Sequence, residues 1–399
     1  MPPPKLLTLA GPQFRSNPYP FYSRLRSDNP VLEAITPDGY TAWLITRYED
    51  ALSALKDKRL SKDKAYLNEK PQWTPAFFRP LERNMLDLDD PEHARLRTLV
   101  HKAFTPRLIE TLRTSIETIT EELIESAKPR GRMDLIAEFA LPLPVAVISK
   151  MLGIPNKERH KFHRWSNAIV TSQSSKIGAL KAIPSAVAFL RYIRRLVRLR
   201  QERPESDLTT ALIQAEEAGD RMNRDEMLAM IFLLLIAGHE TTVNLIGNGM
   251  LALLTHPEQM EKLRADSSLV TSAVEEMLRF DSPLEMATER YTMEKIEVSG
   301  VAIPAGARVY VVIASANRDE QQFEYANQFD VTRLNNRHLS FGMGAHYCLG
   351  APLARLEGQI AITALLKHMP KLHLAVPYNE IRWKPGLLLR GIKALPAEF

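Results

Sequence analysis

The chain has 399 residues, 45% of them hydrophobic, a formal net charge of +5 and one cysteine. This length and hydrophobicity suffice for a large core, and one cysteine excludes an intrachain disulfide and a zinc site made of several cysteines. The positive charge does not by itself indicate nucleic-acid binding, because no nucleic-acid-binding motif or basic segment interleaved with aromatic residues accompanies it.

The chain shows no sign of division into several domains. Proline and glycine are dispersed, and neither an internal repeat nor a Ser/Gly tract interrupts the sequence. Residues 1–5 lack the apolar core of a signal peptide and the long span of a membrane anchor. We therefore expect one domain over residues 1–399, without a membrane anchor, in the cytoplasm.

Helical patterns dominate from Pro91 to Phe280, whereas alternating stretches cluster near 32–46, 296–313 and the C-terminal end. The sequence predicts a mainly α fold with a smaller β region. In it, a β-rich N-terminal part and C-terminal β segments pack on an α-helical body.

The first helix with a chemical signal begins near residue 90. Asp90 is expected to cap it, with Pro91 at the first helical position. His93 and Arg97 lie four residues apart and therefore share one face. They are either a pair of cationic ligands for an anion or part of an ordinary solvated basic face.

The most apolar helix is expected from Asp225 to Leu254. Asn223 is its expected N-cap, with Glu226 in the capping-box position three residues later. The helix should stop before the dipeptide at 256–257, His-Pro, because proline disfavours helical structure there.

This helix breaks its own pattern in the middle. An unbroken hydrophobic run over 227–237 is followed by Gly238, His239, Glu240 and two threonines. A glycine and a carboxylate are costly at such a place, which points to function. An outward-facing polar stripe is the alternative, and the apolar run is shorter than a membrane span requires.

A helix expected over 269–280 carries Glu276 and Arg279, close enough to form a pair that is ordinary at a surface. Arg290 precedes a strand-like stretch from Ile296 to Val309.

The single cysteine, Cys348, stands just before an expected helix over 349–367. The positive end of the helix dipole favours the thiolate, which is the form that binds a metal. Glycines near a ligand let the backbone approach a flat group closely. A buried cysteine acting as a small hydrophobe is the alternative. The residues near Cys348 that favour the metal-ligand interpretation are Phe341, Gly342, Gly344, His346 and Gly350.

The segment FGMGAHYCLG, residues 341–350, resembles the haem-binding loop of the cytochrome P-450 superfamily, the haem-thiolate monooxygenases. The segment AGHETT, residues 237–242, resembles the acid and alcohol motif of the same family. The resemblance covers the chain from about Asn17 to its end. It implies the cytochrome P-450 fold as a single haem domain and haem b (iron protoporphyrin IX), with Cys348 as the axial ligand of the iron.

The resemblance also implies roles for other residues. Glu240 and Thr241 would be catalytic and would deliver protons to bound dioxygen. Glu276, Arg279 and Arg333 would support the cysteine loop, although residues 324–328 lack a proline that the family often has before that arginine. The remaining residues expected to bind the cofactor are His93, Arg97, Arg290 and His346 at the propionates, together with Phe341, Ala237 and Gly238.

The function implied is hydroxylation or epoxidation of a lipophilic small molecule with dioxygen and two electrons. The electrons would come from a separate ferredoxin or flavodoxin with its reductase, and we expect a monomer. A peroxygenase that uses hydrogen peroxide and a non-catalytic haem protein are the alternatives. The basic residues expected to dock the redox partner are Arg95, Lys102, Arg107, Arg337 and Arg355.

The resemblance places the substrate pocket among five segments, which are mostly apolar. Glu285 belongs to one of them. We expect it to face solvent, and the alternative is that it meets a cationic group. The segments are 60–85, 170–184, the helix around 236–241, 284–286 and 387–388.

Overall fold

The computed structural model describes residues 7–8, 11–36, 39–67, 84–155, 157–158, 160–162, 164–165, 168, 176–217 and 219–399. Two compact units are defined by their contacts. The first comprises residues 1–69, 123–140 and 241–399, and the second residues 70–122 and 141–240.

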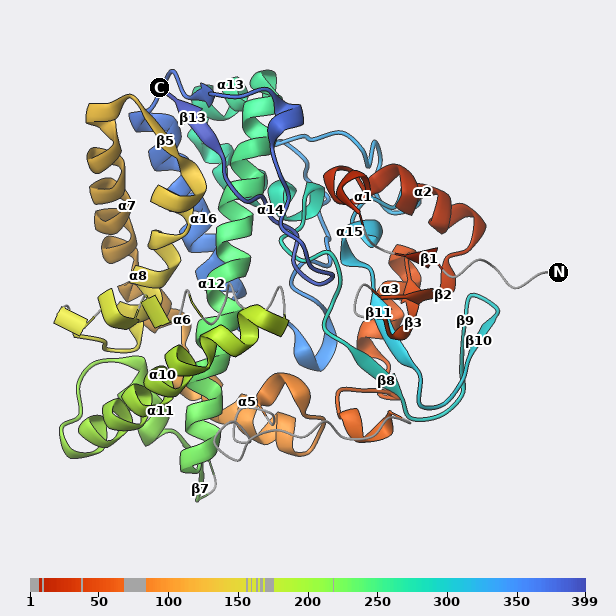
Figure 1. The fold of residues 1–399 in the computed structure, drawn as a ribbon, viewed down its shortest axis with the longest axis horizontal. Helices are drawn as coiled ribbons and strands as arrows, with labels where there is room; N and C mark the ends of the chain where they lie inside the picture. Colours follow the sequence, from red (N-terminus) through yellow and green to blue (C-terminus); the bar gives the residue numbers. More distant parts are fainter. Residues whose placement is uncertain are drawn as a thin grey trace. The chain divides into compact units, whose positions relative to one another are not determined.

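The described residues are mainly helical, with small β-sheets, as the sequence predicted (Figure 1). The α-helices are α1 (Pro12–Ser16), α2 (Tyr19–Asp28), α3 (Tyr48–Lys56), α5 (Glu92–Ala103), α6 (Pro106–Thr111), α7 (Arg113–Ala127), α8 (Pro142–Met151), α10 (Lys176–Glu202), α11 (Leu208–Gln214), α12 (Arg224–Thr255), α13 (Pro257–Ala265), α14 (Val270–Phe280), α15 (Ile313–Ala316) and α16 (Ala351–His368). The strands are β1 (Leu7–Thr8), β2 (Val31–Ile35), β3 (Thr41–Ile45), β4 (Leu60–Ser61), β5 (Arg132–Asp134), β6 (Glu216–Glu217), β7 (Asp220–Arg221), β8 (Arg290–Thr292), β9 (Ile296–Val298), β10 (Val301–Ile303), β11 (Arg308–Val311), β12 (His373–Leu374) and β13 (Pro396–Glu398).

The first unit contains a six-stranded sheet in the order β1-β2-β3-β11-β8-β4. The central strand β11 pairs in parallel with β3, with Val309 opposite Trp43, and antiparallel with β8. All four residues of β11 are buried, as expected for a strand covered on both faces. The sheet therefore connects the N-terminal part of the chain to segments almost 300 residues later.

The hairpin of β9 and β10 turns through two residues, Ser299 and Gly300, both with positive φ (47° and 76°). Such a two-residue turn matches the twist of the strands it joins. Strand β5 joins β13 and β12 in a separate sheet of the same unit. This sheet brings the end of the chain beside residues 132–134.

Helices α12, α14 and α16 pack closely in the first unit. A Cβ on Gly358 of α16 would stand 3.2 Å from Leu245 of α12 and 3.4 Å from Val274 of α14. A Cβ on Gly249 of α12 would stand 2.6 Å from the sulfur of Met277 in α14. Glycine thus allows a close approach between the helix that follows Cys348 and the two helices beside it.

The capping box predicted for α12 is confirmed. Asn223 Oδ1 accepts hydrogen bonds from the backbone N–H groups of Asp225 (3.0 Å) and Glu226 (2.9 Å). The Glu226 carboxylate accepts in return from Asn223 N (2.8 Å). The helix begins and ends within one residue of the predicted bounds, because its caps are local in sequence.

Helix α12 is the one described helix that is long and apolar enough to cross a membrane, but 61% of its apolar window is buried inside the protein. That burial is typical of a core helix.

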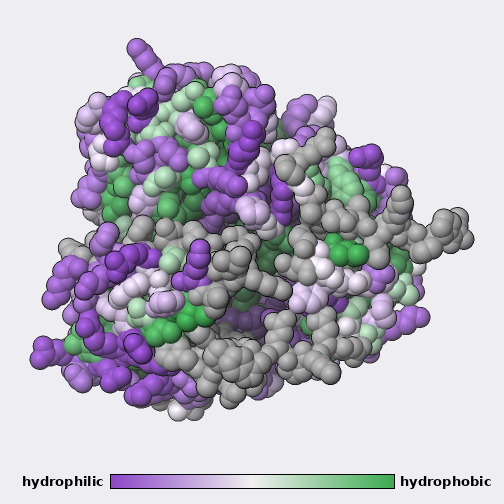
Figure 2. All heavy atoms as spheres, viewed as in Figure 1, coloured by the Kyte–Doolittle hydropathy of each residue, from purple (hydrophilic) through white to green (hydrophobic). Residues whose placement is uncertain are grey.

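On the face drawn in Figure 2, hydrophobic residues show as patches between hydrophilic ones.

The predicted start of α5 is wrong by one residue. Pro91 is the N-cap and Glu92 the first helical residue, so Asp90 lies ahead of the cap. Its carboxylate lies 3.4 Å from Nδ1 of His93 instead. A side-chain contact with the histidine has replaced the capping contact expected from the sequence.

Candidate functional site

The cysteine loop closes on itself through its backbone. Cys348 N donates to Phe341 O (2.8 Å), and Tyr347 N donates to Gly344 O (3.1 Å). Gly342 and Gly344 have φ of 70° and 77°, where an L side chain would be strained. The loop therefore has a defined shape, and the Cys348 side chain is exposed on it.

Gly350 has an ordinary φ of −80°, unlike Gly342 and Gly344. It is the N-cap of α16, and a Cβ there would stand 3.9 Å from the sulfur of Cys348. Its lack of a side chain leaves the space beside the sulfur open. The helix begins at Ala351, three residues after the cysteine, which confirms that Cys348 immediately precedes a helix N-terminus.

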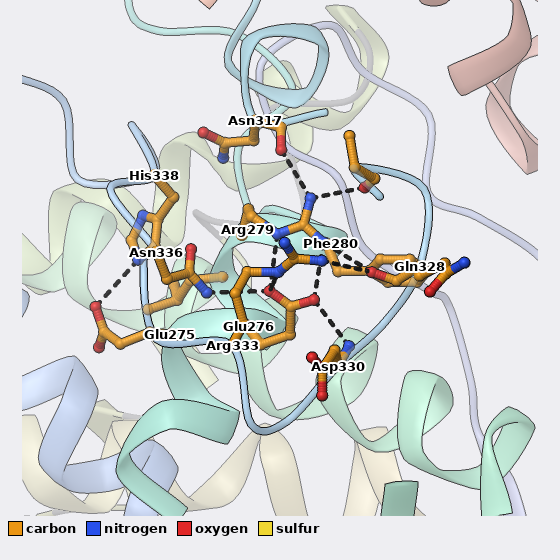
Figure 3. A network of polar contacts seen from close by, with 12 residues as sticks. Glu275, Glu276, Arg279, Phe280, Asn317, Gln328, Asp330, Arg333, Asn336 and His338 are labelled. Atoms are coloured by element: carbon orange, nitrogen blue, oxygen red, sulfur yellow. Dashed lines mark hydrogen bonds and ion pairs between the residues drawn. The ribbon is translucent and has the colours of Figure 1, made fainter. Parts of the chain in front are cut away.

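A buried ion-pair network holds the segment that leads to this loop (Figure 3). Glu276 and Arg279 in α14 are fully buried and form a two-point pair, with N–O distances of 2.7 and 2.8 Å. Arg333 Nε (3.1 Å) and Asn336 Nδ2 (3.0 Å) donate to the same carboxylate, as does the backbone N–H of Asp330 (2.9 Å). The pair is therefore not an ordinary surface pair, and a buried carboxylate with this many donors is fully compensated.

Arg333 also defines the turn for which the family's usual proline is missing. Its guanidinium donates to the carbonyls of Glu324 (2.8 Å) and Tyr325 (3.3 Å). Tyr325 has a positive φ of 49°. Hydrogen bonds from an arginine eight and nine residues further along the chain therefore hold this turn without a proline.

A second network, which the sequence did not predict, supports the loop from α14 and α16. Glu275 accepts two hydrogen bonds from Arg355 (2.7 and 2.8 Å) and lies 3.1 Å from Nε2 of His338. Burial alone would raise the pKa of Glu275, but the hydrogen bonds from Arg355 and His338 lower it to about 2. Arg355 also donates to the Tyr347 hydroxyl (3.3 Å) and stacks on Phe341.

Two of the residues predicted to dock a redox partner are therefore already engaged in the fold. Arg355 pairs with Glu275, and Arg95 in α5 pairs with Asp220 (3.0 Å) and Glu226. The prediction overlooked both because their partners lie 80 or more residues away in the sequence.

Arg290 lies beside the cysteine loop in the first unit. Its Nη2 is 3.4 Å from the carbonyl oxygen of Leu55, at the end of α3. A Cβ on Gly344 would stand 3.0 Å from the same oxygen. The structure thus brings Arg290, which is 6% exposed, to the loop that carries His346 and Cys348.

His93 and Arg97 belong to the second unit, in α5. His93 is buried, Arg97 is partly exposed, and both lie on one helical face. Burial lowers the pKa of His93, and the nearby Arg97 adds to this effect. At neutral pH the imidazole is therefore a neutral donor rather than a cation.

The broken pattern in α12 produces two different faces. Ala237 and Gly238 are exposed in a helix whose other residues are mostly buried, and Thr241, on the same side, is half-buried. His239 and Glu240 are buried, with exposed fractions of 0% and 8%. The polar residues are thus not an outward-facing stripe, because the carboxylate is turned into the protein.

The structure corrects the expectation for Glu285. Its side chain is 1% exposed and accepts from Arg15 (2.8 Å) and the Tyr22 hydroxyl (2.6 Å). It does not face solvent, but meets a cationic group of this chain. Of the predicted pocket segments, residues 68–83 and 170–175 lie outside the described residues.

Comparison with known proteins agrees with the motifs. The sequence profile of cytochrome P450 matches residues 1–372. Cytochrome P450 107B1 of Saccharopolyspora erythraea is 44% identical over 94% of this chain and 93% of its own. The monooxygenase PikC of Streptomyces venezuelae is 43% identical over 100% and 95%.

The solved structure of PksS, the cytochrome P450 of the Bacillus subtilis bacillaene polyketide synthase, superimposes with a TM-score of 0.90. It is 42% identical, and the match covers 97% of this chain and 98% of that one.

The chain belongs to the cytochrome P450 family. It has the single-domain P450 fold and is an oxidoreductase of the monooxygenase class. Membership implies a haem cofactor, a redox partner and a lipophilic substrate.

Proposed function

We propose that this chain is a haem b-dependent monooxygenase that hydroxylates or epoxidises a lipophilic small molecule, with Cys348 as the axial ligand of the iron. The observation that carries the proposal is the exposed thiol on a loop with a defined shape, with ion-pair networks that bind Arg333 before the loop and Arg355 after it. Thiolate-ligated haem supplies the activation of dioxygen that oxidation of an unactivated C–H bond requires.

The residues present fit a haem. Its two propionates require cationic or hydrogen-bonding partners, and we assign His93, Arg97, Arg290 and His346 to them, since these side chains can act as donors. Arg290 is brought to the cysteine loop through Leu55. Phe341, whose carbonyl oxygen accepts from Cys348 N, belongs to the same cofactor site.

Ala237 and Gly238 provide the open stretch of α12 that a flat ligand and its substrate require. A Cβ on Gly238 would have Ile148 at 3.7 Å and no closer neighbour among the described residues, so within that part of the chain the space beside this glycine is not tightly filled.

Glu240 and Thr241 act as the proton-handling pair. The Thr241 hydroxyl is both donor and acceptor, and the Glu240 carboxylate can take up a proton and pass it inward. A peroxygenase, which takes oxygen from hydrogen peroxide, has no need of such a pair. The adjacent acid and alcohol therefore favour the dioxygen-dependent reaction.

The names of relatives support a lipophilic substrate. A mycinamicin IV hydroxylase/epoxidase of Micromonospora griseorubida is 39% identical to this chain, and the structure of CYP267B1 in complex with myristic acid is 40% identical, with a TM-score of 0.90. We infer that the substrate is a macrolide, another polyketide or a fatty-acid chain. The described segments 284–286 and 387–388 contribute apolar side chains to its pocket.

The electrons come from a ferredoxin or flavodoxin with its reductase, and the protein works in the cytoplasm as a monomer. After Arg95 and Arg355 are removed from the predicted docking set, Lys102, Arg107 and Arg337 remain exposed. They are the residues to which an acidic partner would be drawn.

Reduction of the purified protein under carbon monoxide tests the proposal. We expect the red-shifted Soret absorbance of a thiolate-bound haem, and its loss in the variant Cys348→Ser. Ser268→Ala, at an exposed 3-10 turn, is the control for handling and should keep the band. A band that persists in Cys348→Ser would exclude this sulfur as the ligand.

A further inference from the structure

Two loops of the first unit are joined by their backbones: the 281–286 loop, which follows α14, and the 387–391 loop near the C-terminus. The hydrogen bonds run from Glu285 N to Leu388 O (2.8 Å) and from Arg390 N to Pro283 O (2.9 Å). An isolated β-bridge pairs Leu284 with Leu389 between them. The two loops therefore form one short two-stranded element, although about 100 residues separate them in sequence.

The first anchor of this element is Glu285. Its two carboxylate oxygens have different partners: Oε2 accepts from Arg15 Nη1 (2.8 Å), and Oε1 accepts from the hydroxyl of Tyr22 (2.6 Å). Burial and the neighbouring Glu285 raise the pKa of Tyr22, so its hydroxyl remains a donor. Arg15 of α1 and Tyr22 of α2 thus bind the 281–286 loop through its Glu285 side chain.

The second anchor is Arg390, which is 2% exposed. Its Nε donates to Asp281 Oδ1 (2.6 Å), and its Nη1 donates to the carbonyl oxygen of Arg15 (2.9 Å). The Tyr19 hydroxyl donates to the same Asp281 oxygen (2.6 Å), and the guanidinium stacks on Trp383 at 3.8 Å. Arg390 of the 387–391 loop therefore binds both the 281–286 loop and α1.

The third anchor comes from α12. Asn248 Nδ2 donates to both loops, to the carbonyl oxygens of Asp281 (3.2 Å) and Arg390 (3.0 Å). Asn248 lies two helical turns after Thr241 on the same helix. A Cβ on Gly391 would stand 1.9 Å from Oδ1 of Asn244, so a side chain at that position would push the loop away from α12.

The same element carries apolar side chains that are partly exposed. Leu284, Leu387, Leu388 and Leu389 are each of intermediate exposure, and Leu387 and Leu388 pack against the buried cluster that contains Tyr22 and Met286. A rigid backbone that presents apolar side chains is suited to hold a lipophilic ligand in one orientation.

We propose that the buried network of Arg15, Tyr22, Asn248, Asp281, Glu285 and Arg390 is a positioning device that fixes the two loops relative to α12 and thereby selects which carbon atom of the substrate is oxidised. The inference rests on the proposed function, in which these loops line the pocket. The network residues do not touch the substrate. Small displacements of a bound chain change which C–H bond is within reach, so the choice of carbon depends on how firmly the loops are held.

Two conservative variants test the device. Tyr22→Phe removes one hydroxyl and its bond to Glu285, and Asn248→Leu removes the links from α12 while keeping a similar volume. The matched control is Tyr310→Phe, because Tyr310 is also a buried residue and its hydroxyl also donates to a glutamate at 2.6 Å, but that glutamate, Glu289, is in neither loop.

The first measurement is hydrogen exchange of the haem-loaded protein without substrate. The peptides that cover 281–287 and 387–392 should exchange about fivefold faster in both variants, as expected when a buried hydrogen bond is lost, and at the original rate in the control. Unchanged exchange in both peptides would overturn the inference.

The second measurement uses myristic acid as the probe, with a surrogate ferredoxin and its reductase. We expect the ratio of positional isomers of hydroxymyristic acid to change at least threefold in each variant, with the carbon monoxide band intact, because a loosened pocket positions the chain less strictly. An isomer ratio that stays constant while the loops exchange faster would also overturn it. Absence of the carbon monoxide band from the unaltered protein would instead overturn the proposed function and leave the exchange result to decide whether the network holds the loops.

Discussion

Two buried glutamates show how surroundings decide what a single carboxylate does. Glu276 accepts hydrogen bonds from Arg279, Arg333 and Asn336, and so holds the chain that leads to the cysteine loop. Glu357 in α16 is 3% exposed, and among the described residues its Oε2 has no hydrogen-bond partner. Burial raises the pKa of Glu357 to about 8, so this carboxyl is neutral at pH 7.

The raised pKa of Glu357 makes stability depend on pH. The unfolded glutamate ionises near pH 4.5 and the folded one near pH 8, so its contribution is complete below pH 4.5 and is lost as pH rises to 8. We expect Glu357→Gln to stabilise the haem-loaded protein by about 1–3 kcal/mol at pH 8 and to have less effect at pH 5. Thermal unfolding at the two pH values measures this, with the exposed Glu121→Gln as control. A larger gain at pH 5 would contradict it.

A substitution at Thr241 can test the reaction without disturbing the fold. It is half-buried in the middle of α12, so Thr241→Ala removes a hydroxyl without removing a core side chain. We expect normal haem content and a normal carbon monoxide band, but a fall of roughly tenfold or more in product formed per electron pair consumed, with hydrogen peroxide released instead. Parallel assays of reductant, peroxide and product check it. Unchanged coupling would remove Thr241 from the proton path.

At the scale of the element, local signals predicted the helices well. The start of α12 followed from the capping residues Asn223 and Glu226, and its end followed from the His-Pro dipeptide at 256–257. The start of α5 was misplaced because a proline and an aspartate at a helix start are compatible with more than one capping geometry. The element made by the 281–286 and 387–391 loops has no local signal, because its strands are distant in sequence.

Contacts between elements predict that substitution by alanine has different effects on stability at two glycines. In Gly391→Ala the new methyl group would meet the buried Asn244 side chain at 1.9 Å, so we expect a loss of about 1–3 kcal/mol of stability. In Gly249→Ala it would meet the flexible side chain of Met277, and alanine favours the helix by up to about 1 kcal/mol, so a change near zero is expected. Chemical denaturation of the haem-loaded variants compares them. Equal losses would show that Asn244 moves aside as easily as Met277.

For the whole molecule, the surface charges relevant to electron transfer are those that the fold leaves exposed. We expect Lys102→Glu with Arg107→Glu, and separately Arg337→Glu, to slow reduction by an acidic ferredoxin about tenfold at low salt and much less at high salt. Stopped-flow reduction at several salt concentrations provides the measurement. Arg198→Glu, an exposed site of α10 outside the predicted set, is the control for a change in net charge.

Rates insensitive to salt and to these reversals would rule out docking by these residues. Arg95→Glu should act differently. It breaks ion pairs with Asp220 and Glu226 and should therefore lower stability as well as the reduction rate.

The sequence by itself determined the family, the mainly α fold, the bounds of α12 and the loop around Cys348. These depend on residues that are neighbours in the chain, so the spacing of a few side chains carries the information. The pairing of Glu276 with Arg279 was also within reach, because three residues separate them on one helix.

Only the tertiary structure decided that Glu285 is buried against Arg15, that Arg355 supports the cysteine loop through Glu275, and that Asn248 ties two loops to α12. Each of these contacts joins residues 33–270 positions apart. A charged or polar side chain can interact favourably with water or with a partner in the protein, and the two differ little in free energy. The sequence alone does not show which partner the fold brings to that side chain.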